Sequence, residues 1–190
     1  MQLFNTPLPD GAPYGESNRE VLYIAVGGAI HAWEEVESAL ARLFLAFSGT
    51  EELPENLAAY GSDNRRFSDR MKATRGAAAS YFVKTHDQDF EGLTIKVLRE
   101  IECLSIERHR IAHGKIAMLA KFDIPDGVGT ITVSSTVMYR WGAPFYSVSN
   151  LRTSLGGLVA ADIDALHDEF GRMFGEVESL TNRIVPWPSR

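Results

Sequence analysis

Apolar residues in the segment 159–184 recur at alternating steps of four and three, and no other pattern constrains the fold as strongly. The positions are Val159, Ile163, Leu166, Phe170, Met173, Val177, Leu180 and Ile184. Such steps place the side chains along one stripe of a helix. The segment is therefore predicted to form a long helix that buries this stripe, in a core or in an interface, and that stops before Pro186.

Three earlier segments also show helical spacing: 18–47, 64–84 and 90–113. Pro54 suits the first position of a further short helix over 55–60. The apolar stripe predicted for the first segment comprises Tyr23, Val26, Ile30, Trp33, Leu40, Phe44 and Phe47. Glu37 occupies the remaining position of that stripe, where a carboxylate needs a partner.

The pattern changes from helical to alternating between the third and the last of these helices. Residues 116–122, 130–141 and 145–148 read as three strands, with turns at 126–127 and 142–144. The predicted fold is mainly α: a bundle of four to five helices with a small antiparallel β meander, at about 115–150, inserted before the last helix. Residues 1–17 contain three prolines and are expected to be a flexible arm that precedes a single domain over 18–190.

Composition narrows the class of protein and its compartment. The formal charge of −6 argues against a protein that coats nucleic acid nonspecifically, although it allows a local basic site. Cys103 is the only cysteine, so no intrachain disulfide forms and a cytoplasmic location is expected. The first residues lack a basic start followed by an apolar run, and no apolar run is long enough to span a membrane.

Cations gather at the end of the third helix. Arg108 lies on its apolar stripe between Leu104 and Ile111, where a charged group is costly without a partner. One reading is a structural ion pair between Arg108 and Glu37. Another is a phosphate site, because guanidinium engages two oxygens and stays charged. Both roles are compatible.

His109 and His113 follow in the next turn, before Gly114. Imidazole titrates near neutral pH and suits proton transfer. The alternative for His113 is a structural bond to the last helical carbonyls. The two histidines also have the spacing of metal ligands on a helix, but zinc requires a third close ligand and none is evident. No metal site or cofactor is expected.

The run Arg108-His109-Arg110-Ile111-Ala112-His113 resembles the Arg–polar–three residues–His motif of HEPN-domain proteins. Trp33 with Glu37, and Phe67-Ser68 with Lys72, resemble positions in the first helices of that family. The resemblance implies an RNA-acting helical bundle, in some members a metal-independent endoribonuclease of toxin or defence type with an antitoxin partner. It implies that His113 acts as the base, that Arg108 stabilises the transition state and that His109 fills the polar position.

The spacing of Arg108 and His113 on a helix limits how the two side chains can form one site. Five helical residues turn ~500°, so Arg108 and His113 point ~140° apart on a regular helix. Either the helix opens before Gly114 or a second chain contributes, as in the dimer cleft of HEPN ribonucleases. A homodimer is therefore expected.

The second helix begins with a basic stretch that includes Arg65, Arg66 and Arg70. These residues and Arg110 are the candidate RNA contacts, although charge runs on helices are usually solvated faces. The alternative function is a non-catalytic HEPN-like binding or dimerisation module with a structural Arg–His motif.

Overall fold

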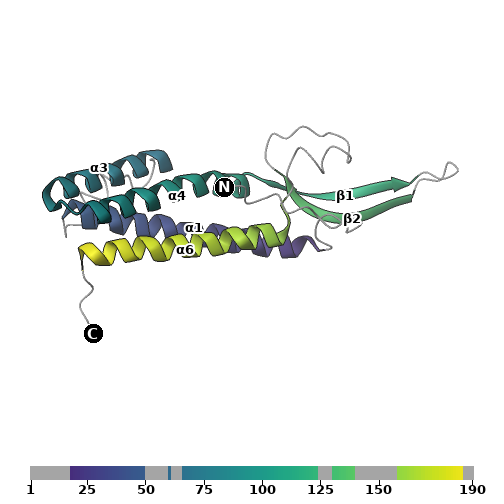
Figure 1. Cartoon of the computed structure of the whole chain (residues 1–190). Helices are drawn as coiled ribbons and strands as arrows, with labels where there is room; N and C mark the ends of the chain where they lie inside the picture. The colour runs from purple at the N-terminus through teal and green to yellow at the C-terminus, as the bar shows by residue number, and fades with distance from the viewer. Residues whose placement is uncertain (1–17, 50–59, 61–65, 124–129, 140–157, 186–190) are drawn as a thin grey trace. The chain divides into compact units, whose positions relative to one another are not determined.

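The fold is known for residues 18–49, 60, 66–123, 130–139 and 158–185, which a computed structural model describes. This part of the chain contains four helices and two strands (Figure 1). Their order is α1 (Arg19–Ser48), α3 (Phe67–Thr85), α4 (Gln88–Ala112), β1 (Lys115–Asp123), β2 (Thr130–Tyr139) and α6 (Ala160–Ile184). The predicted mainly α class is thus confirmed. None of the described helices has the length and apolar character needed to cross a membrane.

The described residues fall into two compact units. Unit 1 consists of Met1–His31 with Glu107–Asp168, and unit 2 of Ala32–Ile106 with Glu169–Arg190. The predicted arm 1–17 and the short helix 55–60, apart from the helical residue Tyr60, lie outside the described residues. The single domain over 18–190 stays a prediction.

Local side-chain and backbone bonds explain where the helices begin and end. The side chain of Asn18 accepts a hydrogen bond from the backbone N–H of Glu20 (2.9 Å) and so caps α1. Gly49 ends that helix with a φ of 69°, in the left-handed conformation that glycine adopts without strain. His86 ends α3 in the same conformation, and the Asp87 carboxylate accepts the N–H of Phe90 (3.0 Å) at the start of α4. A two-residue connection therefore separates α3 from α4.

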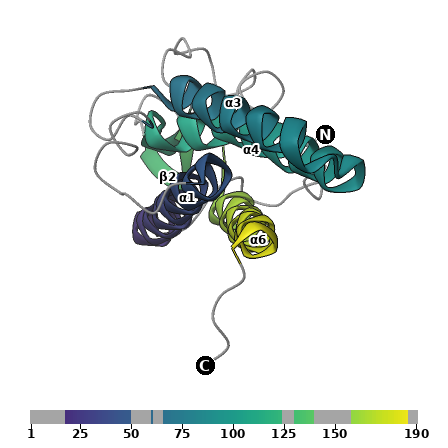
Figure 2. The same ribbon diagram turned by 90° about the vertical axis from the view of Figure 1, so that its left-hand side faces the viewer.

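Unit 2 contains segments of all four helices (Figure 2), and contacts between aromatic side chains join them. The Trp33 ring on α1 lies 5.3 Å from Phe67 on α3 and 5.2 Å from Phe170 on α6, between ring centroids. A second aromatic group joins α1, α3 and α4 at Phe47, Tyr81, Phe82 and Phe90. These ring contacts supply the long-range burial that orders the helices.

The predicted stripe of α6 is confirmed at six of its eight positions, while Val159, just before the helix, and Ile184, at its end, are half-buried. Its buried side chains are Ile163, Leu166, Phe170, Met173, Val177 and Leu180, each at most 1% exposed. The steps of four and three left only one apolar face from which to choose.

The predicted stripe of α1 is correct only in its second half. Trp33, Leu40, Phe44 and Phe47 are buried as expected, but Tyr23 is 55% exposed and Val26 and Ile30 are half-buried. The buried positions before Trp33 are instead Leu22, Ala25, Ala29 and Ala32. Three of these four side chains are alanine, and at nearby Gly28 an added Cβ would lie at an ordinary contact distance of 3.7 Å from the His167 ring.

The β insert differs in part from the expectation. β1 and β2 form a two-stranded antiparallel sheet in which Lys115 pairs with Tyr139 and Asp123 with Thr130, with a register shift between Leu119 and Ala120. A three-stranded meander is not seen among the described residues. The expected third strand, 145–148, lies outside them.

Candidate functional site

The last turn of α4 stays helical up to His113. The N–H of His113 donates to the carbonyl of His109 (3.1 Å), which is the helical bonding pattern, and the N–H of Gly114 donates to Ile111 (3.3 Å). The helix therefore does not open between Arg108 and His113. Bringing these two side chains to one site would therefore need a second chain, and the homodimer stays a prediction.

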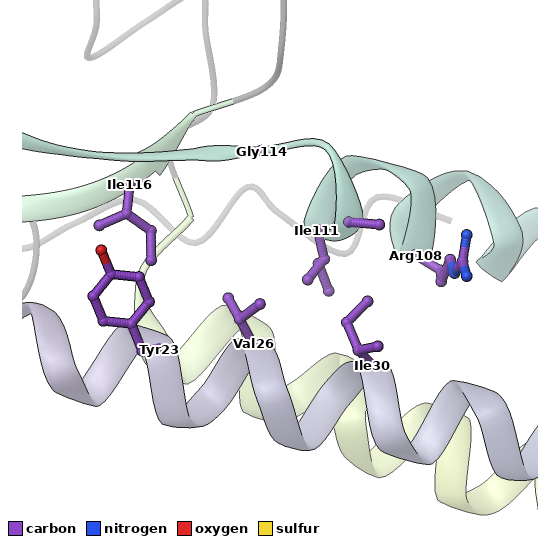
Figure 3. A pocket seen from close by; sticks show the side chains of 8 residues that line it. Tyr23, Val26, Ile30, Arg108, Ile111, Gly114 and Ile116 are labelled. Carbon is purple, nitrogen blue, oxygen red and sulfur yellow. The ribbon is translucent and has the colours of Figure 1, made fainter.

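Arg108 lines an open groove of about 490 Å³ in unit 1. Tyr23, Val26 and Ile30 of α1 face Arg108 and Ile111 of α4 across this groove (Figure 3). The remaining lining residues are Ala112, Gly114 and Ile116. Figure 3 places Tyr23 at one end, beside Ile116, and Arg108 at the other. The groove thus has an aromatic ring at one end, a cation at the other and aliphatic walls between them.

The guanidinium of Arg108 is only partly accessible. The residue is half-buried, and its Nε atom is buried from solvent. A half-buried guanidinium loses much of its hydration, so an anion that reaches its accessible edge is bound more strongly than at an exposed arginine.

His109 and His113 are both exposed and lie side by side. Their ring centroids are 4.3 Å apart, with an angle of 51° between the ring planes. Neither ring is among the groups that line the Arg108 groove. The structure therefore places the two imidazoles together on one face of α4 and Arg108 on another face.

Arg110 is engaged locally. Its Nη1 donates to both carboxylate oxygens of Glu107, at 2.9 and 2.8 Å. The two residues are three apart on the helix, which is the usual spacing of a surface ion pair. This contact competes with the predicted contact to RNA.

Glu37 lies in unit 2, in a contact that the sequence did not predict. Its carboxylate accepts a hydrogen bond from the indole N–H of Trp33 (2.7 Å) and pairs with Arg70 of α3. The Glu37 and Arg70 side chains are only 15% and 19% exposed. The predicted pairing of Glu37 with Arg108 stays a prediction.

Tyr60 extends this buried contact. Its hydroxyl forms a hydrogen bond with Arg70, and its ring lies 5.3 Å from that of Phe44. Burial raises the pKa of Tyr60 to about 12; the nearby Arg70 opposes the shift and Glu37 adds to it. The phenol is thus held neutral inside unit 2.

The basic stretch of the second helix does not present a uniform surface. Arg66 is exposed just before α3, whereas Arg70 is half-buried against Glu37. Arg75 contacts Glu102 at 2.7 Å. Arg65 lies outside the described residues. Of the described RNA candidates, Arg66 is the one whose side chain is exposed without a recorded contact to a carboxylate.

Tyr23 is the groove residue that sequence reasoning assigned to the core. A phenol has both an apolar ring and a polar tip, and such side chains often lie at boundaries. The only available signal was the Leu22–Ala25–Ala29 spacing, which offers a competing buried face.

No group of three or more histidine, cysteine, aspartate or glutamate side chains among the described residues is arranged to hold a metal ion. Comparison with models of protein families, with curated proteins and with solved structures finds no match for this chain.

Proposed function

We propose that this chain is a HEPN-like, RNA-acting protein and a metal-independent endoribonuclease of toxin or defence type. The observation that supports it most is the end of α4, where Arg108 faces an open groove and His113 stays exposed one turn further along. An accessible imidazole can serve as a general base, and a guanidinium can stabilise the charge that develops on phosphoryl oxygens, so the two groups suit metal-free cleavage of RNA.

The proposed reaction is an internal phosphoryl transfer. His113 takes the proton of a ribose 2′-hydroxyl, and the 2′-oxygen attacks the adjacent phosphorus. The bond to the 5′-oxygen of the next nucleotide breaks, which leaves a 2′,3′-cyclic phosphate. Arg108 stabilises the charge on the phosphoryl oxygens, and His109 is the second imidazole available to protonate the leaving oxygen.

A homodimer completes the proposed site. Because α4 remains helical through His113, Arg108 and His113 of one chain point in different directions. Arg108 of one copy and His113 of another would serve one phosphate. Light scattering at micromolar concentration should give twice the chain mass of 21.0 kDa; a monomer mass would contradict this part of the proposal.

Tyr23 gives the groove a further role in RNA binding. Single-stranded bases stack on exposed aromatic rings, at about 1–3 kcal/mol for each base. An unstacked base on Tyr23, with its phosphate toward Arg108, would use both ends of the groove. Tyr23→Ala should then raise KM for RNA more than it lowers kcat.

End-group analysis of RNA cut by purified protein tests the chemistry. We expect cleavage to persist in chelator and to leave 2′,3′-cyclic phosphate ends. His113→Ala and Arg108→Ala should each remove most activity and be non-additive, because both act on one transition state. Arg110→Ala is the matched control. Chelator-sensitive cleavage, a 3′-hydroxyl product or full activity in His113→Ala would contradict the mechanism.

The second candidate is a non-catalytic HEPN-like binding or dimerisation module. The contacts of Arg70 with Glu37 and of Arg110 with Glu107 favour it, because they engage two predicted RNA contacts in pairs within the protein. Expression in a bacterial host separates the candidates. Toxicity that His113→Ala abolishes supports the enzyme and an antitoxin partner, and its absence favours the binding module.

A further inference from the structure

We propose that His109 and His113 together bind one divalent transition-metal ion, of the class Zn²⁺, Ni²⁺ or Cu²⁺. The two residues are four apart on α4, both are exposed and their rings are neighbours. This site is separate from the Arg108 groove, since neither ring lines that groove. The sequence alone argued against a metal because it offered no third ligand, but the ring geometry supports a two-ligand site.

The distance between the rings suits a shared metal ion. A zinc–imidazole nitrogen bond of about 2.0–2.1 Å puts a ring centroid ~3.2 Å from the metal. Two such rings have centroids ~4.5 Å apart at the right angle of a tetragonal Ni²⁺ or Cu²⁺ site, and ~5.2 Å apart at the tetrahedral angle of zinc. The observed separation is 4.3 Å. The rings are therefore within ~1 Å of the separation that a shared metal ion requires, and both side chains are exposed.

The electrostatic setting also favours a cation. Both histidines lie in or just after the last turn of α4, where the helix dipole presents its negative end. Arg108 and Arg110 are the opposing charges on this turn, and the Glu107 carboxylate engages Arg110 at 2.8 Å. Glu107 and the dipole thus offset part of this positive charge.

Water fills the remaining coordination positions in this proposal. Among the described residues no third ligand joins the pair, so affinity should be in the micromolar range and follow the general order for nitrogen ligands, with Cu²⁺ above Ni²⁺ and Zn²⁺. Mg²⁺ prefers oxygen ligands and should not compete. A metal on His113 would occupy a nitrogen that the proposed proton transfer uses, so the same ion would inhibit cleavage.

Calorimetric titration of the tag-free, chelator-stripped full chain with NiCl₂ or ZnCl₂ tests the site without reference to RNA. We expect one ion per chain, with His109→Ala and His113→Ala each weakening binding by at least about tenfold, because each removes one of two ligands. His31→Ala is the control, since it removes an exposed histidine from α1. Circular dichroism should show unchanged helix content in all three variants.

Each outcome decides the proposal. One ion per two chains, with the same loss in both variants, would support the site and add a second copy's imidazoles to it. No saturable binding below millimolar metal would overturn it. Equal affinity in wild type and both variants would also overturn it, as would an equal loss in His31→Ala. Because the readout is heat of binding, failure of the proposed nuclease leaves this result unaffected.

Discussion

Arg70 and Arg110 each contact a glutamate, but the two arginines differ in exposure. Arg70 of unit 2 meets Glu37 among aromatic rings, and both side chains are less than one-fifth exposed. Arg110 of unit 1 meets Glu107 on the last turn of α4, where the two side chains are 38% and 17% exposed. A buried pair is strongly destabilised when one partner is lost, whereas an exposed pair contributes little. The same two residue types therefore meet deep in unit 2 and nearer the surface in unit 1.

The largest expected effect is a loss of RNA cleavage without a loss of stability. His113→Ala should lower RNA cleavage by about 100-fold or more, which is the scale of a lost general base. Its ring is exposed, so the free energy of unfolding should change by less than about 0.5 kcal/mol. Parallel cleavage rates and denaturant titrations measure both quantities. A large loss of stability would show that the histidine supports the fold.

In unit 2 we expect the reverse: a substitution that lowers the stability of the protein. Glu37→Ala removes the carboxylate that Arg70 and the Trp33 indole contact, and should destabilise the protein by about 2–3 kcal/mol, below the fully buried limit. Glu178→Ala is the matched control, because it breaks the exposed contact with Arg42 (2.8 Å) and should change stability by less than about 1 kcal/mol. Equal effects in the two variants would remove the distinction between buried and exposed pairs.

Alkaline pH should reduce the stability that the buried phenol of Tyr60 contributes to unit 2. Its pKa is raised from 10.0 to about 12 in the folded chain, so the folded state holds this proton more tightly than the unfolded state. The contribution is full below pH 10 and is lost as the pH rises toward 12, to a total of about 2–3 kcal/mol. Unfolding free energies of wild type and Tyr60→Phe at pH 9 and 11 isolate it. Parallel pH dependences in the two proteins would contradict the prediction.

Sequence patterns predicted the helices better than they predicted which side chains of different helices contact each other. The stripe of α6 was predictable because its period left one apolar face. In α1, Tyr23, Val26 and Ile30 compete with a second apolar row that includes Leu22, Ala25 and Ala29. The larger side chains of Tyr23, Val26 and Ile30 favour burial of their row on the sequence alone. In the structure the other row is buried instead. Periodicity alone cannot choose between them.

Single residues of the candidate site show the same limit of prediction from sequence. Glu37 was identified from the sequence as a carboxylate in need of a partner, and Arg70 as a cation, but the sequence does not specify which helices meet. Arg108 fitted Glu37 equally well on helical spacing. By contrast, the neighbouring positions of His109 and His113 follow from their spacing of four, and the structure shows their rings together. Contacts within a helix are predictable, and contacts between helices need the packing.

The smallest expected effect comes from Arg110→Ala. Its contact with Glu107 joins residues three apart on one partly exposed helical turn, so its loss should change the free energy of unfolding by less than about 1 kcal/mol. Cleavage should fall by less than about threefold, because Glu107 already engages the guanidinium and only a weak contribution to phosphate binding remains. Rates at two salt concentrations measure this, since a direct phosphate contact makes binding more salt-dependent. If Arg110→Ala matched Arg108→Ala in its loss of activity and lowered the salt dependence, Arg110 would be an RNA contact despite Glu107, and exposure rather than pairing would identify the functional arginines of this chain.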